Sequence, residues 1–192
     1  MSQDDVNALC AACDIVVAIN DAYRLLPNRG DGCHVYGADP TWWQYHIDAF
    51  LDNCNATGYT QHLNWEPGKA EGFGLTVIKS KGERGLSRDP NWLHQGQNSG
   101  YQGINLAYHL LRERFGDAHH RILLTGFDMS RDNGQAHWFG EHPKGLVRCG
   151  RYETYADAFR TIKPKSYNLD IINCSRRTAL DAFPRMSLKD AL

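Results

Sequence analysis

Short apolar runs alternate with segments of helical periodicity along this chain. The strongest strand signal comes from Arg121 to Gly126. The run from Ile15 to Ile19 is apolar throughout, which is typical of a strand buried on both faces of a parallel sheet. The other predicted strands are residues 33–39, 74–78 and 169–173, and the predicted helices are residues 2–13, 39–54, 98–115 and one from residue 152. This alternation predicts an α/β fold, a Rossmann-like open and mostly parallel sheet with helices on both faces.

Residues at the predicted helix ends have known capping preferences. Ser2 and Asp5 have the spacing of a capping box at the start of the first helix. Asp39 suits the N-cap of the second helix, and Pro40 suits its first position. Gly116 follows the long third helix and is a typical C-terminal stop. These residues therefore predict where the helices begin and end.

Two long stretches, residues 79–97 and 128–151, carry no clear periodicity. Connections of that length inside a compact domain are uncommon and are usually functional. If the strands are parallel, both stretches lie at the same edge of the sheet, where ligands bind in open α/β sheets. The sequence therefore predicts a binding site at that edge.

The composition predicts one globular domain over residues 1–192. The chain is 42% hydrophobic and 22% charged, which is enough for one core. Its net charge of -1 provides no general field for a nucleic-acid backbone, so nucleic acid is not the expected partner. No apolar run is long enough for a membrane and no export signal is evident, so we expect a cytoplasmic protein that does not bind membranes. The cysteines are expected to be reduced thiols, and Cys10 with Cys13 makes only half of a zinc site.

Polar side chains follow three of the predicted strands. Asn20 and Asp21 come directly after the first, Asp39 ends the second, and Asp128 follows the strand at Arg121 to Gly126. Each of them alone is explained equally well as a turn residue or a helix cap. Three such places at one sheet edge are a stronger signal, because unrelated turns need not converge. We expect these side chains to contact a ligand.

The start of the helix at Asn98 is a candidate anion site. Asn98 or Ser99 can cap the helix, and Gly100 allows a ligand to approach the backbone. Amide hydrogens of the first turn and the helix dipole favour an anion such as phosphate. The alternative is a well-capped helix without a ligand, since this is neither a Walker loop nor a dinucleotide fingerprint.

Two histidines, His137 and His142, lie in the second stretch without periodicity. Either imidazole could act as a general base or acid near neutral pH. With Asp128 or Glu141 either could also join a metal site, so a divalent metal is an open alternative. The adjacent Trp138 and Phe139 could fold this loop over a ligand as a lid. Solvated loop histidines are the alternative interpretation.

Six segments together resemble a family of phage and bacterial proteins related to bacterial sialyltransferases, with the archaeal 6-hydroxymethylpterin diphosphokinase in a wider circle. The segments are VVAINDAY, GADPTWW, QNSGYQGINLAYHL, RILLTGFDM, HWFGEHP and IINCSRRTALDAFP. The resemblance covers residues 14–192 and is most specific in the order of these blocks and at NSG and GFD. It implies a Rossmann-like fold that binds a nucleotide, commonly a nucleotide sugar, at the carboxyl ends of the strands.

The resemblance also implies roles for single residues. Asn20 matches an asparagine that contacts the nucleotide. Ser99 and Gly100 match a Ser-Gly pair near the phosphate, and Gly126 and Asp128 match a glycine placed two residues before an acid.

The chain departs from the family pattern at its start. Such proteins usually open with a further strand and a glycine-rich loop, and Met1 stands about where that loop would end. Part of the phosphate cradle and a first, central strand would then be missing. A sheet edge left open in this way could be covered by another chain, so a homo-oligomer is an open alternative.

We therefore expect a glycosyltransferase-like protein that binds a nucleotide sugar as co-substrate and transfers the sugar to a hydroxyl acceptor. The resemblance makes His137 or His142 the base that deprotonates the acceptor. One alternative is a non-catalytic nucleotide-binding accessory protein of a phage, acting in the host cytoplasm. Another is a metal-dependent diphosphokinase that uses Asp39 and Asp128.

Overall fold

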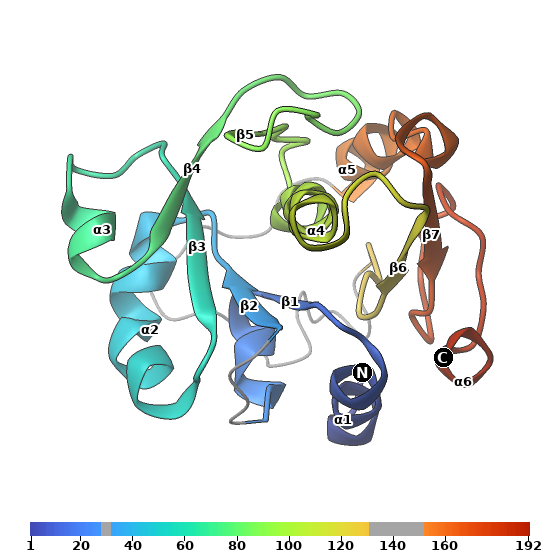
Figure 1. Cartoon of the computed structure of the whole chain (residues 1–192), viewed down its shortest axis with the longest axis horizontal. Helices are drawn as coiled ribbons and strands as arrows, with labels where there is room; N and C mark the ends of the chain where they lie inside the picture. The colour runs from blue at the N-terminus through green and yellow to red at the C-terminus, as the bar shows by residue number, and fades with distance from the viewer. Residues whose placement is uncertain (28–31, 131–151) are drawn as a thin grey trace.

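The computed structural model describes residues 1–27, 32–130 and 152–192, and it has an α/β architecture with parallel sheets (Figure 1). The larger sheet has five strands in the order β1-β2-β3-β4-β5, and a smaller sheet pairs β6 with β7. All neighbouring strands run parallel. The strands are β1 (Val16–Ile19), β2 (Cys33–Tyr36), β3 (Thr57–Gln61), β4 (Thr76–Ser80), β5 (Trp92–Leu93), β6 (His120–Leu124) and β7 (Leu169–Asn173). The helices are α1 (Gln3–Ala12), α2 (Pro40–Asn53), α3 (Lys69–Gly72), α4 (Ser99–Phe115), α5 (Tyr152–Arg160) and α6 (Leu188–Ala191), with 3-10 helices η1 (Asn20–Leu25) and η2 (Pro164–Tyr167).

The helix boundaries predicted from capping residues are confirmed. The Asp5 amide donates to Ser2 Oγ at 3.3 Å, and the Ser2 amide donates to Asp5 Oδ2 at 2.7 Å, which completes the capping box. Asp39 Oδ1 accepts from the Thr41 amide at 2.8 Å at the start of α2. Gly116 ends α4 with a φ of 72°, a conformation that favours glycine. Local sequence therefore determines these helix ends.

Two strands are not predicted by the sequence. In β3 the only large apolar residue is Tyr59, so the strand shows no apolar run. Gly58, the second residue of β3, is buried, and a Cβ there would lie 2.6 Å from Leu75 Cδ2. Neighbouring side chains thus fill the space that a larger residue would occupy. The second unpredicted strand, β5, has two residues and lies in the stretch 79–97.

The two faces of the larger sheet bury different side chains. Val35 packs with Trp43 and Phe50 of α2 on one face, and α1 covers the same face at Cys33. Tyr36 packs with α4 on the other face. This alternation follows from the two-residue period of a strand. Helices therefore cover both faces of the sheet, as predicted.

The chain changes direction across the sheet between β5 and β6. After β1 to β5 have been laid down in one direction, α4 runs back past β1 and leads to β6 on its other side (Figure 1). Among the described residues no ladder joins β1 to β6. A reversal of this kind is the topological switch point at which open α/β sheets bind ligands.

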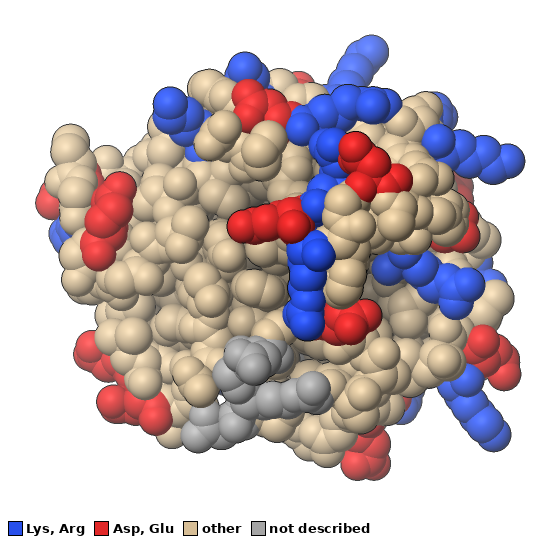
Figure 2. Space-filling model, in the orientation of Figure 1, with Lys and Arg blue, Asp and Glu red and all other residues tan. Residues whose placement is uncertain are grey.

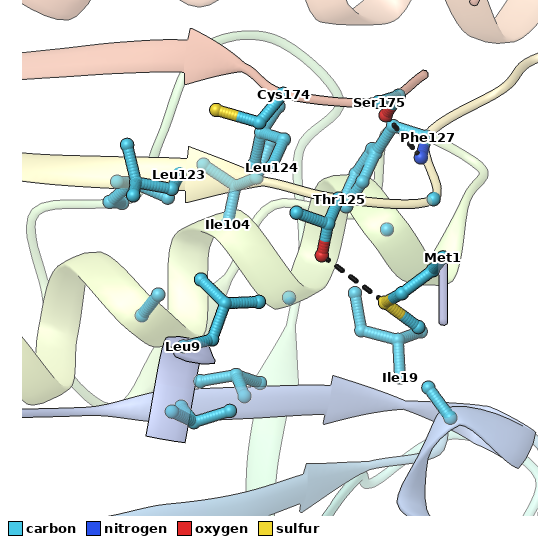
Figure 3. Close-up of a pocket in the computed structure, with 18 of the residues that line it drawn as sticks. Met1, Leu9, Ile19, Ile104, Leu123, Leu124, Thr125, Phe127, Cys174 and Ser175 are labelled. Carbon is cyan, nitrogen blue, oxygen red and sulfur yellow. Dashed lines mark hydrogen bonds between the residues drawn. The ribbon is translucent and has the colours of Figure 1, made fainter. Parts of the chain in front are cut away.

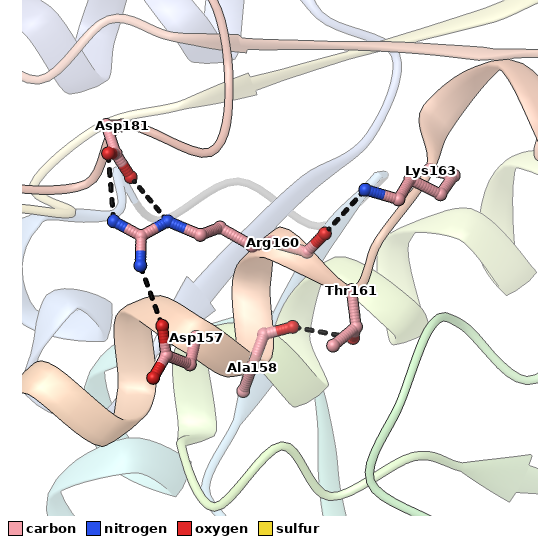
Figure 4. A network of polar contacts seen from close by, with 6 residues as sticks. All are labelled: Asp157, Ala158, Arg160, Thr161, Lys163 and Asp181. Carbon is pink, nitrogen blue, oxygen red and sulfur yellow. Dashed lines mark hydrogen bonds and ion pairs between the residues drawn. The ribbon is translucent and has the colours of Figure 1, made fainter.

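Arg160 ties α5 to the segment that follows β7 (Figure 4). Its Nε and Nη2 donate to the two carboxylate oxygens of Asp181 at 3.1 and 2.9 Å, and its Nη1 donates to Asp157 at 2.7 Å. A paired geometry of this kind orients both partners. It holds the segment after β7 beside the core.

Charged side chains of both signs lie on the surface. In Figure 2 the lysines and arginines lie mainly along the upper and right parts of this face, with acidic residues among them. No uninterrupted cationic surface is visible on this face. None of the helices in the described ranges is long and apolar enough to cross a membrane.

We expect His109 to make the stability of the fold depend on pH. Its Nε2 lies 2.9 Å from Trp92 O and 3.1 Å from Asn105 Nδ2 inside the protein. Burial lowers the pKa of His109 below its ordinary value of 6.5, because the charged form loses its hydration. As the pH falls below 6.5, His109 is protonated in the unfolded chain before it is protonated in the folded protein. The free energy of unfolding therefore decreases with falling pH between 6.5 and the lower pKa of the folded state.

Urea denaturation at a series of pH values measures this effect. The free energy of unfolding should fall from neutral to mildly acidic pH, and it should fall less steeply in His109→Gln. Equal slopes in the two proteins would contradict the assignment to His109.

Candidate functional site

A large cavity lies between β1, at the edge of the larger sheet, and β6, at the edge of the smaller sheet. Its volume is about 1870 Å³, and all residues of β1 and β6 line it. Residues of α1 and α4 line it as well, and Figure 3 shows Leu9 and Ile104 between the strands. Pockets for single small ligands usually measure about 300–1,000 Å³. The cavity therefore has room for more than one small molecule.

Polar residues from three parts of the chain gather at the carboxyl end of this cavity. Asn20 follows β1, Ser99 begins α4, and Asp128 lies beyond β6. These residues are far apart in the sequence, and the parallel strands bring them to one place. The predicted site residues that line the cavity are Asn20, Asp39, Asn98, Ser99, Gly100, Gly126 and Asp128.

The start of α4 is already capped by a side chain. Asn98 Oδ1 accepts from the Gly100 and Tyr101 amides at 2.8 and 3.2 Å, so Asn98 is the cap and Ser99 is not. The amide and hydroxyl of Ser99 have no hydrogen-bond partner among the described residues. An anion at this end would therefore be bound through Ser99, while two further amides of the first turn serve the cap.

Packing against its neighbours also requires glycine at position 100. A Cβ at this position would lie 2.8 Å from Phe127 Cε1 and 2.8 Å from Asn98 Oδ1. The space over Gly100 is thus taken by the Phe127 ring and the cap. Close approach of a ligand to this backbone, which the sequence predicts, would require Phe127 to move.

Three non-glycine residues with a left-handed backbone line the cavity. Asn20 has a φ of 50°, Gln97 of 55° and Met129 of 49°. Asparagine tolerates this conformation, but glutamine and methionine adopt it rarely. Such strain costs about 1–3 kcal/mol per residue and is concentrated at functional sites. Nothing in the local sequence indicates that Gln97 and Met129 have a left-handed backbone.

Asp39 and Asp21 differ in their relation to the cavity. Asp39 lines it, and its Oδ1 caps α2. Asp21 does not line it: its side chain is buried, accepts from Trp42 Nε1 at 2.9 Å and pairs with Arg24 at 3.1 Å. Asp21 therefore holds η1 against α2, whereas the sequence pattern predicts a ligand contact.

The segments after β6 and β7 are joined by hydrogen bonds. The Phe127 amide donates to Ser175 Oγ at 2.8 Å, and Thr178 Oγ1 donates to the Phe127 carbonyl at 2.6 Å. The Ala179 amide donates to the Asp128 carbonyl at 2.8 Å. These bonds fix the backbone of Asp128, whose side chain is exposed at the cavity.

The same segment brings arginines to the cavity that the sequence did not single out. Arg176 and Arg177 follow β7 and line the cavity. Arg176 Nη2 lies 3.0 Å from Asp5 Oδ2 at the start of α1. Burial alone would raise the pKa of Asp5, but hydrogen bonds from Ser2 and Arg176 lower it. An arginine pair three residues beyond the end of a predicted strand is the sequence signal that could have identified these cationic residues.

Two predicted catalytic residues, His137 and His142, lie outside the described residues. In the described parts of the chain, no three His, Cys, Asp or Glu residues are placed to hold a metal ion. Five of the six cysteines fall in those parts, and none of these five, which include Cys10 and Cys13, forms a disulfide with another described residue.

Comparison with known proteins identifies no relative. No protein-family model matches the chain, and no curated protein and no solved structure is similar to it. The resemblance to the sialyltransferase-related family thus stays a prediction from the sequence.

Proposed function

We propose that this chain binds a nucleotide at the carboxyl end of the cavity, as the donor part of a nucleotide sugar, and acts as a glycosyltransferase-like protein. One observation carries the proposal. Asn20, Ser99 and Asp128 come from three separate parts of the chain and line the same cavity at the topological switch point.

The chemistry of this end suits a phosphorylated ligand. The amide and hydroxyl of Ser99 are donors at the positive end of the α4 dipole. Arg176 and Arg177 add cationic donors on the opposite wall. Arginine binds phosphate oxygens with paired hydrogen bonds, which would place the phosphates between α4 and the segment after β7. The Asn20 side chain would then contact the ribose or the base of the nucleotide.

Transfer of the sugar requires a base and a stabilised leaving group. His137 or His142 would take the proton of the acceptor hydroxyl while its oxygen bonds to the anomeric carbon. The bond from that carbon to the phosphate oxygen breaks, and the electron pair stays on the phosphate. The arginines would stabilise this charge as it develops.

Isothermal titration calorimetry with a panel of nucleotides and nucleotide sugars tests the binding. We expect one class to bind, and Ser99→Ala to weaken it about tenfold or more, the usual cost of one hydrogen bond to a charged group. Ser166→Ala, an exposed serine in η2, is the matched control and should leave the affinity unchanged. Absence of binding by the whole panel would remove the proposal.

A second candidate function is sequestration of a nucleotide without catalysis. It is favoured by the cap at α4, because Asn98 occupies two first-turn amides that could otherwise stabilise a leaving phosphate.

Prolonged incubation with the bound nucleotide sugar, followed by mass spectrometry, separates the two functions. A sequestering protein returns the ligand intact, whereas an enzyme hydrolyses or transfers it. Alanine at whichever of His137 and His142 is the base should then abolish turnover in the enzyme and leave binding unchanged. Loss of turnover with a chelator would favour the diphosphokinase instead.

A further inference from the structure

The cavity between the sheets is bounded by the open edge of β1. The N–H and C=O of one strand residue point to the same side of the strand, and the side alternates along it. The Val16 amide donates to the Gly32 carbonyl at 2.7 Å, on the side of β2. The amide and carbonyl of Val17 and the amide of Ile19 therefore point to the other side, into the cavity, whereas the Ile19 carbonyl begins η1.

The opposite wall presents the open edge of β6. The His120 amide donates to the Asn168 carbonyl at 3.1 Å, on the side of β7. By the same alternation, the main-chain groups of Arg121 and Leu123 point into the cavity. Among the described residues neither edge has a ladder partner on this side. Figure 3 shows β1 and β6 running in the same direction on either side of the space.

The other two walls are apolar. Val6 and Leu9 of α1 line the cavity from one face of the sheet, and Ile104, Ala107 and Leu111 of α4 line it from the other. An occupant lying between the strands would thus place apolar side chains on both of its faces. Central strands of parallel sheets have this composition.

We propose that this cavity is a docking site for one extended polypeptide strand, apolar on both faces, that pairs in parallel with β1 and β6 and joins the two sheets. Both walls carry main-chain donors and acceptors that have no partner within residues 1–27, 32–130 and 152–192, and a polypeptide backbone matches their spacing. A lipid chain would fill the volume but leave these groups without partners, at about 1–3 kcal/mol for each buried group. The proposal goes beyond nucleotide binding, which uses the carboxyl end of the cavity.

A fluorescent peptide with the sequence KKVIVIVKK tests the proposal by anisotropy titration. The expected result is saturable binding to the whole chain, at least tenfold tighter than that of KKVIPIVKK, in which one proline removes a central amide. Hydrogen exchange should slow at the amides of Val17, Ile19, Arg121 and Leu123 when the first peptide is bound. Equal binding of the two peptides, no binding, or binding of a fatty acid in place of the peptide would overturn the proposal.

A matched pair of protein variants tests the β6 edge. Arg121→Pro and Arg121→Ala both remove an exposed side chain, but proline alone removes the amide that points into the cavity. We expect the peptide affinity of Arg121→Pro to be at least tenfold lower than that of Arg121→Ala, because only proline removes the amide. Circular dichroism monitors folding, and if Arg121→Pro is unfolded, the exchange experiment on the parent protein decides. Nucleotide titrations are done without peptide, so failure of one proposal is distinguishable from failure of the other.

Discussion

Replacing Trp43 by alanine is expected to lower the free energy of unfolding by about 3–5 kcal/mol. The side chain is 0% exposed, and its ring lies 5.3 Å from that of Phe50. Its Nε1 donates to the Gly37 carbonyl at 2.8 Å. The site is shaped for this ring, since a Cβ on Gly37 would lie 2.8 Å from Nε1 and one on Gly58 3.2 Å from Cη2. Alanine would leave a cavity that these fixed neighbours cannot fill.

Chemical denaturation measures the effect of Trp43→Ala, with Leu51→Ala as the control in the same helix. Leu51 is 60% exposed, so its truncation should change stability by less than about 0.5 kcal/mol. Trp43→Phe keeps a ring and loses the hydrogen bond, and it should fall between the two. A cost for Trp43→Ala no larger than that of the control would refute this account of the core.

Replacing Asp21 by alanine is expected to lower the free energy of unfolding by about 1–3 kcal/mol, because it leaves the buried indole N–H of Trp42 without its acceptor. The carboxylate is 2% exposed and accepts from Trp42 Nε1 at 2.9 Å. Arg24 lies 3.1 Å from its other oxygen, and His46 Nε2 lies 3.8 Å from that same oxygen. The indole N–H would be left in the core without this acceptor.

Two further variants separate a structural role of Asp21 from a role in binding. The Arg24 side chain is 50% exposed, so Arg24→Ala removes a solvated ion pair and should cost no more than about 1 kcal/mol. Asp21→Asn keeps the size and one acceptor, so we expect a protein that folds. Its nucleotide affinity should equal that of the parent, because Asp21 does not line the cavity. A selective loss of affinity in Asp21→Asn would restore Asp21 to the binding site.

The candidate site could be predicted from the sequence only in part. Asn20, Ser99 and Asp128 are predictable because the ends of parallel strands and the start of the following helix lie at one edge of a sheet. Arg176 joins them only through the hydrogen bonds between the segments after β6 and β7. The backbone of Gln97 at a φ of 55° also has no signature in the local sequence.

The sequence by itself determined the parallel α/β class, most of the strands and the helix caps. Each of these depends on the identity of residues within a few positions, whose periodicity and capping hydrogen bonds are local. Only the tertiary structure decided that β1 and β6 stay apart around one cavity, and that the successive residues Trp42 and Trp43 are both buried. Strand pairing and burial depend on contacts between residues far apart along the chain. Local patterns do not contain that information, because one apolar strand can pair with many different neighbours.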